Sequence, residues 1–131
     1  MAYRRIRPNP AFRSYFKAYQ GVQVKAVTEA VLLDCIAGCP IDSGDLVESL
    51  DTRYPGELRG LVTVGGEGAE HWATVEYGSR PHIIESHGPW SLHNVEEDEY
   101  YGQVVHHPGT PEQPFMRPAL YRRRRLVRAS R

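Results

Sequence analysis

The chain has 131 residues, of which 40% are hydrophobic and 24% charged, and its formal net charge is zero. This length suits one domain with a modest core, and the composition excludes wholesale disorder, so we expect a single domain over residues 1–131. No apolar run approaches the roughly 20 residues that span a bilayer, and no apolar stretch follows the basic start. We therefore expect a soluble, unexported protein with no membrane contact.

The zero net charge hides a strong segregation along the chain. Residues 1–25 carry six basic residues and no acid, residues 117–131 carry seven arginines and no acid, and all 16 acids lie between them with three basic residues. The ends together therefore carry +13 and the middle −13. Charge segregated in this way favours contact between the ends of one copy and the body of another, or between the ends and nucleic acid.

The chain begins with a basic segment, residues 1–10, in which two prolines predict an extended arm that contains Arg4, Arg5 and Arg7. Asn9 is suited to cap a helix and Pro10 to occupy its first position. An amphipathic helix that ends near Gly38 is predicted by the helical spacing of its apolar residues, Phe12, Tyr15, Phe16, Tyr19, Val22, Ala26, Ala30 and Leu33. Gly21 interrupts this pattern and leaves a division into two helices open.

The pattern changes to period two from Leu50 onward. Residues 50–54 and 58–64 read as the strands of a hairpin around Pro55 and Gly56. Residues 72–77 fit a short helix that Gly78 closes. A strand at residues 82–85 is expected to pair with residues 100–106, with the polar, acidic residues 86–99 as a long exposed loop or hairpin tip.

A last helix is predicted after Pro118, whose missing N–H does no harm in a first turn, and it leads into an arginine-rich tail over residues 122–131. The predicted fold class is therefore α+β, with a long N-terminal helix, an antiparallel β-sheet with a long hairpin, a short middle helix and a C-terminal helix.

Candidate catalytic and metal sites are weak. Ile41-Asp42-Ser43-Gly44 matches the short motif of retroviral-type aspartic proteases, but it follows a helix and continues with Asp45, so Asp42 and Ser43 are better interpreted as caps of the next turn. Cys35 and Cys39 stack on one helix face as reduced, buried thiols. These cysteines and the six histidines do not have the spacing of a zinc site. We expect no enzyme, no metal and no cofactor.

Two charged segments are candidates for interaction. Arg122, Arg123, Arg124 and Arg125 could bind phosphate, but on a helix they point in four directions about 100° apart, and only an extended tail would present them together. Contact with an acidic protein surface, such as Glu96, Glu97, Asp98 and Glu99 of a neighbouring copy, is an equal alternative. Trp72, Tyr77 and Phe115 are aromatic anchors for which core packing is the default.

Three blocks of turn residues and apolar anchors follow one another along the chain. The first runs from Pro40 to Leu50 and includes Asp42, Gly44 and Leu46. The second contains Val75, Glu76, Tyr77 and Gly78. The third runs from His107 to Leu120 and contains His107, Pro108, Gly109, Gln113, Pro114, Phe115, Arg117, Pro118 and Leu120. In this order and spacing they resemble a family of tailed-bacteriophage head-tail joining proteins, the neck or tail-completion proteins.

This resemblance, which covers residues 40–120, implies a virion component, a ring of six subunits at the head-tail junction that completes the tail and joins it to the DNA-filled head. The implied partners are other copies of the chain, the neighbouring neck, stopper or tail-tube proteins, and genomic DNA that passes through the lumen without sequence-specific binding. The implied locations are the virion and, during assembly, the host cytoplasm. One departure is Val47-Glu48 after Leu46, where the family often has a basic residue.

Two alternatives stay open. A tail terminator that caps the tail tube belongs to the same class of small α+β ring formers. A small nucleic-acid-binding protein that uses both arginine-rich ends belongs to a different class, and it predicts DNA affinity that falls steeply with salt. The aspartic protease is a distant third possibility.

Overall fold

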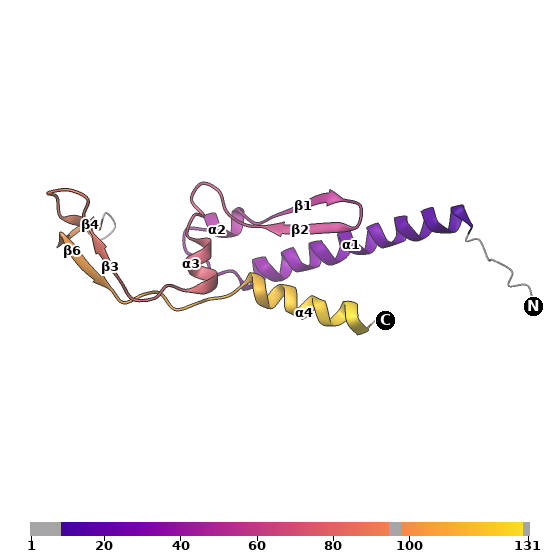
Figure 1. Cartoon of the computed structure of the whole chain (residues 1–131). Helices are drawn as coiled ribbons and strands as arrows, with labels where there is room; N and C mark the ends of the chain where they lie inside the picture. Colours follow the sequence, from indigo (N-terminus) through magenta and orange to yellow (C-terminus); the bar gives the residue numbers. More distant parts are fainter. Residues whose placement is uncertain (1–8, 95–97, 130–131) are drawn as a thin grey trace, which may run out of the picture. The chain divides into compact units, whose positions relative to one another are not determined.

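The structure, a computed structural model, describes residues 9–94 and 98–129. It is α+β, with long α1 (Pro10–Gly38), small two-stranded antiparallel sheets, a short middle helix and a C-terminal helix that packs on α1 (Figure 1). This confirms the predicted fold class. The chain forms two compact units, unit 1 (Met1–Glu70 and Phe115–Arg131) and unit 2 (His71–Pro114).

The helix α1 forms without a break from Pro10 to Gly38. It begins where expected, because the Asn9 side chain accepts a hydrogen bond from the Ala11 N–H at 2.9 Å and Pro10 occupies the first turn. It ends at Gly38, after which Cys39 is extended. The possible division at Gly21 does not occur. A glycine at this position leaves room for the hairpin, since a Cβ there would lie 3.3 Å from the Glu57 carbonyl oxygen.

The hairpin of β1 (Asp51–Gly56) and β2 (Arg59–Thr63) lies along α1, as predicted from the period-two pattern. Close packing requires Gly60, since a Cβ there would overlap the Thr28 side chain of α1. The Tyr54 hydroxyl donates a hydrogen bond of 2.5 Å to Glu29 on α1. This hydrogen bond raises the pKa of Tyr54 above its ordinary value.

The apolar core lies in unit 1. The one-turn helix α2 (Asp45–Glu48) carries the buried Leu46, and α4 (Met116–Ala129) follows the fully buried Phe115. A Cβ at Gly38 would lie 3.8 Å from Cβ of Phe115, so the end of α1 meets the start of α4. The buried apolar residues of the described chain are Val31, Cys35, Cys39, Leu46, Leu50, Ala69, Phe115 and Ala119. All eight belong to unit 1.

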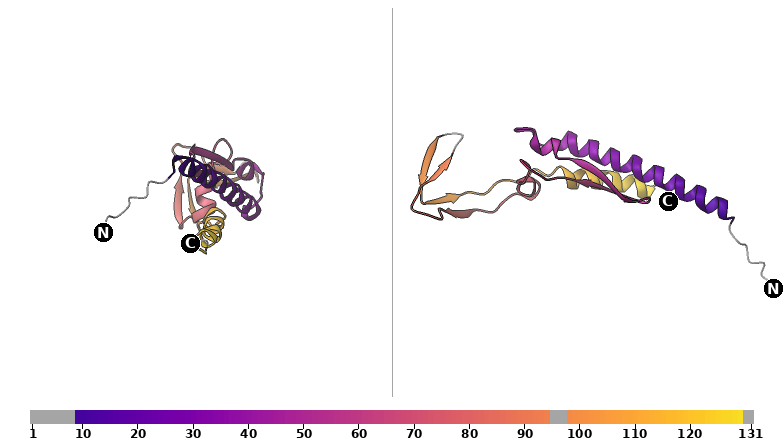
Figure 2. Two further views of the ribbon diagram at one scale, coloured as in Figure 1. Left: turned by 90° about the vertical axis from the view of Figure 1, so that its right-hand side faces the viewer. Right: turned by 90° about the horizontal axis from the view of Figure 1, so that it is seen from above.

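In unit 1, two elements pack on α1, the β1–β2 hairpin and α4. The β1–β2 hairpin packs on one side of α1 and α4 on another (Figure 1, Figure 2). The α4 contact involves Asp34 and Gly38 and therefore lies at the C-terminal part of α1. At the other end of α1, Lys17 forms an ion pair with Glu57 of the hairpin turn.

Unit 2 begins with α3 (Trp72–Tyr77), which Gly78 closes as predicted. The strand β3 (His82–Glu85) pairs with β6 (Val104–His107), and β4 (Leu92–Asn94) pairs with β5 (Glu99–Gly102). We call these four strands, residues 82–107, the ribbon. It contains no apolar residue that is buried, within the part of it that the structure describes.

Two details of unit 2 differ from the sequence-based expectation. The partner of β3 is residues 104–107 alone, because Gly102 adopts a left-handed conformation with φ 82° and ends β5 before β6 begins. The segment 86–99, expected to be a loop or hairpin tip, contributes β4 and the start of β5. The single sheet envisaged from the sequence is therefore three separate two-stranded pairs.

Candidate interaction surfaces

The second and third sequence blocks come together in unit 2. Ser79 and Thr110 form a backbone bridge, with N···O distances of 2.9 and 3.1 Å, and the Ser79 hydroxyl accepts a further hydrogen bond from the Thr110 N–H. The Gln113 N–H donates to the Val75 carbonyl at 2.8 Å. Residues 31 and 38 positions apart are thus joined through their main chains, so these two blocks have a structural role.

Two glycines of these blocks are required by the bridge. Gly78 has φ 70° and Gly109 has φ 88°, conformations that side chains rarely adopt. A Cβ on Gly78 would lie 2.8 Å from the Thr110 carbonyl oxygen, and one on Gly109 would overlap the Ser79 carbonyl oxygen. The His107 ring accepts the Gly109 N–H at 3.0 Å and orders the same turn.

Other residues of the second and third blocks divide between interior and surface. Glu76 is a fully buried carboxylate, and buried side-chain polar atoms without a hydrogen-bond partner are absent from the part of the chain that the structure describes. Phe115 is the anchor that the sequence predicted, whereas Tyr77 is exposed and Trp72 half-buried. The remaining members, Pro108, Pro114, Arg117, Pro118 and Leu120, are exposed or half-buried.

The first block forms the turn into α2. Gly44, with φ 99°, occupies the N-cap position and provides no side-chain cap. The capping role expected of Asp42 and Ser43 belongs in part to Ser43, whose hydroxyl accepts a hydrogen bond from the Asp45 N–H at 3.4 Å and donates one to the Asp45 carboxylate at 2.7 Å. Asp42 is exposed before this turn, and Leu46 is its buried anchor.

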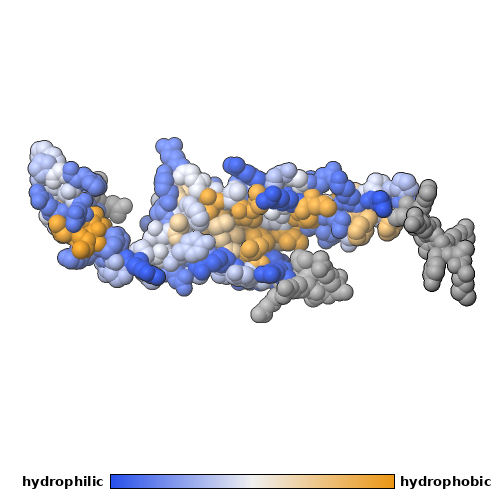
Figure 3. All heavy atoms as spheres, in the orientation of Figure 1, coloured by the Kyte–Doolittle hydropathy of each residue, from blue (hydrophilic) through white to orange (hydrophobic). Residues whose placement is uncertain are grey.

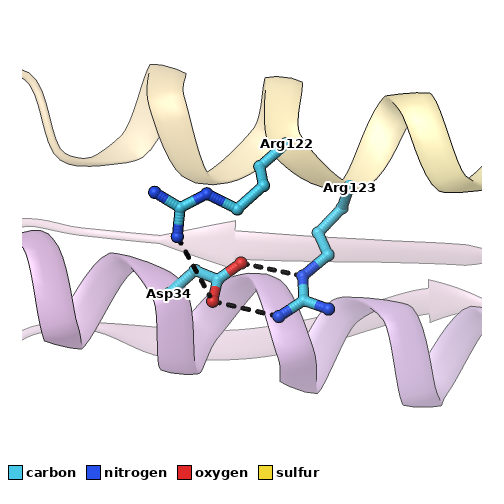
Figure 4. Close-up of polar contacts among 3 residues, drawn as sticks. All are labelled: Asp34, Arg122 and Arg123. Carbon is cyan, nitrogen blue, oxygen red and sulfur yellow. Dashed lines mark hydrogen bonds and ion pairs between the residues drawn. The ribbon is translucent and has the colours of Figure 1, made fainter.

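The arginine-rich segment lies on α4, which continues to Ala129. Arg123 donates two hydrogen bonds to Asp34 of α1, from Nε to Oδ2 at 2.7 Å and from Nη2 to Oδ1 at 3.0 Å (Figure 4). Arg122 Nη1 lies 3.9 Å from Asp34 Oδ1. The hydrogen bonds from Arg123 lower the pKa of Asp34, and the same pairing raises the pKa of Arg123. This pairing within the chain was not apparent from the sequence, because its partners are 89 positions apart.

Several predicted interaction residues lie outside the described residues. These are Arg4, Arg5 and Arg7 of the N-terminal arm, Glu96 and Glu97 of the acidic segment and the side chain of Arg125. Arg124, Asp98 and Glu99 are exposed. Asp98 pairs with His93 at 2.8 Å, and the His93 ring stacks on Tyr100 with centroids 4.3 Å apart.

No cluster of three or more potential metal ligands occurs in residues 9–94 and 98–129. Cys35 and Cys39 are buried and form no disulfide, and burial raises the pKa of the Cys39 thiol. His82 and His107 are cross-strand neighbours whose ring centroids lie 4.9 Å apart. Within the same described ranges, no helix is long and apolar enough to cross a membrane.

An exposed apolar surface lies on α1. Phe12, Tyr15, Phe16, Tyr19 and Val22, which we call the aromatic stripe, belong to the apolar repeat that predicted an amphipathic helix, and they are all exposed, Tyr15 by 71%. The buried face instead carries Thr28, Val31 and Cys35. A second, weaker apolar repeat at Val24, Val31 and Cys35 was the signal that could have identified this face.

A shallow groove adjoins the aromatic stripe. It is lined by Ser14, Lys17, Ala18, Gly21, Val22, Lys25 and Glu57. Lys17 is paired with Glu57, and the Lys25 ammonium lies 5.9 Å from the centroid of the Tyr54 ring. The groove beside the stripe therefore carries two basic residues and one acid. Hydrophobic residues gather on the molecular surface both along α1 and on the ribbon (Figure 3).

These features define an α+β protein with exposed apolar residues on α1 and on the ribbon. The chain matches no protein-family model, and neither the curated proteins nor the solved structures searched include a match.

Proposed function

We propose that this chain is a structural virion protein of a tailed bacteriophage, which assembles into a ring at the head-tail junction, completes the tail and joins it to the DNA-filled head. The phage assignment rests on the resemblance of the three sequence blocks. It is supported by the main-chain bonds that join Val75 and Ser79 to Gln113 and Thr110, because residues with a structural role are what such a motif requires.

The observation that carries self-association is the distribution of apolar residues. All the buried apolar residues of the described chain lie in unit 1, whereas the ribbon and the aromatic stripe expose theirs. Contiguous exposed apolar surface marks interaction sites in soluble proteins. A structural protein that assembles with further copies accounts for two such surfaces on a chain of 131 residues.

A ring fits the charge distribution. Contacts in a ring are heterologous, so one face of each subunit meets a different face of the next, and segregated charge provides that complementarity. The neighbours in the virion would be neck, stopper or tail-tube proteins, with genomic DNA in the lumen. A tail terminator, which caps the tail tube, is the alternative position in the same assembly.

The experiment is sedimentation velocity of the purified chain in low and high salt, alone and with double-stranded DNA, followed by negative-stain electron microscopy of the largest species. We expect closed rings that weaken as salt increases and do not bind DNA. A monomer that binds DNA, with affinity falling steeply with salt, would instead establish the nucleic-acid-binding alternative. Open filaments would contradict the neck-ring proposal.

The pairing of Arg123 with Asp34 bears on that alternative. A guanidinium that donates two hydrogen bonds to a carboxylate of its own chain has fewer donors left for phosphate. Arg122 also reaches Asp34, with Nη1 3.9 Å from Oδ1, so two consecutive arginines of α4 face a carboxylate of their own chain. Both points favour the structural role over DNA binding.

A further inference from the structure

The aromatic stripe is an unpartnered helix face. Because successive helical residues advance by about 100°, Tyr19 points roughly opposite to Gly21, the position at which the hairpin turn approaches α1. The second neighbour of α1, α4, meets it near Asp34 and Gly38, well beyond the stripe. The stripe is thus left uncovered by both elements that pack on α1.

The ribbon is an incomplete sheet. A two-stranded pair is marginally stable in water, and a third strand or a packed apolar face normally stabilises it. In the register of β3 and β6, Ile83 and Val104 lie on the same face, and both are more than half exposed. Further along the ribbon, Trp90 and Tyr100 are exposed by 79% and 71%. These side chains need a surface to cover them.

The two surfaces have opposite electrostatic surroundings. Unit 1 has fifteen basic and nine acidic residues, a net charge of +6, whereas unit 2 has one basic and seven acidic residues, a net charge of −6. Around the stripe, Arg13, Lys17 and Lys25 are exposed on α1, Glu57 of the hairpin pairs with Lys17, and residues 1–25 contain no acid. On the ribbon, Glu85, Asp98 and Glu99 are exposed.

This charge distribution selects the occupant. A second aromatic stripe would place basic flanks against basic flanks, and a second ribbon would place acids against acids, whereas stripe and ribbon attract each other. We infer that the ribbon of one copy of this chain packs on the aromatic stripe of a second copy. Because the two surfaces differ, each copy has one of each, and the contact propagates from copy to copy.

This inference rests on the self-association in the proposed function, but not on the phage assignment or on ring closure. It is tested by mixing two variants whose substitutions leave the charge of the chain unchanged. The stripe variant is Tyr15→Gln with Tyr19→Gln, since glutamine is a good helix former. The ribbon variant is Ile83→Thr with Val104→Thr, since threonine is a good strand former. All four side chains are exposed, so neither variant removes a core contact.

We expect each variant alone to self-associate with an apparent Kd weakened roughly tenfold or more, as for loss of anchor residues at an interface. Mixed together, they should form a heterodimer, because the stripe variant keeps an intact ribbon and the ribbon variant keeps an intact stripe. Sedimentation velocity with one variant fluorescently labelled measures this. Ile41→Gln, at an exposed position of unit 1 outside the stripe, is the matched control and should associate like the wild type.

The outcomes separate the two proposals. Wild-type protein that assembles while both variants assemble equally well would overturn the ribbon-on-stripe contact and leave the ring intact. Variants that fail alone and do not rescue each other would overturn it too, because an intact ribbon and an intact stripe would then be present together without binding. Rescue of the mixed variants, together with open filaments of the wild-type protein, would support the contact but contradict the neck ring. A wild type that stays monomeric at all concentrations tested would contradict both.

Discussion

At the scale of single residues, Asp34 links the two long helices of unit 1. It receives two hydrogen bonds from Arg123, and these lower its pKa. A carboxyl whose pKa is lower in the folded than in the unfolded chain stabilises the fold at pH values above its unfolded pKa, about 4. That contribution is lost as the pH falls through the lowered pKa of the folded state.

We therefore expect Asp34→Asn to reduce the melting temperature at pH 7, with the difference from wild type shrinking as the pH falls below about 4. Thermal denaturation followed by circular dichroism at a series of pH values measures this. Asp42→Asn, at an exposed carboxylate outside the helix pair, is the control and should have little effect. A difference for Asp34→Asn that persists unchanged in acid would show that the ion pair contributes nothing.

Gly60 sets how closely the hairpin approaches α1. Since a Cβ there would overlap Thr28, Gly60→Ala should cost about 1–3 kcal/mol of unfolding free energy, as other overpacking substitutions do. The matched control is Gly56→Ala in the same hairpin, where no atom lies within 4 Å of the added Cβ. Urea denaturation compares the two variants.

A companion substitution tests the cause of that loss. Adding Thr28→Ala to Gly60→Ala removes Oγ1 and Cγ2, two of the three Thr28 atoms that the Cβ would meet, so part of the lost stability should return, and the two changes should be non-additive. Equal losses for Gly60→Ala and Gly56→Ala would mean that the hairpin does not pack on α1 at this distance.

At the scale of elements, the β1–β2 hairpin and the ribbon differ in what stabilises them. The hairpin β1–β2, like the pair β3–β6, has only two strands, but it packs on α1, whereas the ribbon has no buried apolar residue in its described part. The free energy of local opening depends on such packing, so we expect the ribbon to open more readily than the β1–β2 hairpin.

Hydrogen exchange should reveal this inequality. In the dissociated protein, at high salt and low concentration, the amides of β3 and β6 should exchange much faster than those of β1, β2 and the Thr28–Cys35 part of α1. In the assembled protein they should become protected, because the ribbon gains an apolar partner. Protection of β3 and β6 in the monomer equal to that of β1 and β2 would argue that the ribbon is stable alone.

At the scale of the whole molecule, the charge distribution matters more than the total. A net charge of zero hides units of +6 and −6, so in the proposed contact of ribbon with stripe opposite charges meet although each copy is neutral overall. Exposed charges interact across a screening length of about 10 Å in 0.1 M salt and about 3 Å in 1 M salt. The salt-sensitive assembly expected in sedimentation follows from this shortening.

Much of the fold could be predicted because the signals are local. Asn9 and Pro10 start a helix, Gly38 and the following Pro40 end it, and each does so through its own backbone. The hairpin around Pro55 and Gly56 and the short helix closed by Gly78 depend on neighbours within a few residues. The burial of Phe115 was predicted for similar reasons.

The sequence by itself thus determined the elements, the α+β class and the segregation of charge. Only the tertiary structure decided which face of α1 is buried, because two apolar repeats share that helix. Gly21 and Gly60 leave room for the hairpin to pack closely on α1. The tertiary structure also decided that Arg123 pairs with Asp34 and that Gln113 bonds to Val75, since such contacts depend on how distant segments pack. The aromatic stripe is exposed for the same reason: spacing specifies a helix face, whereas its neighbours specify whether that face is covered.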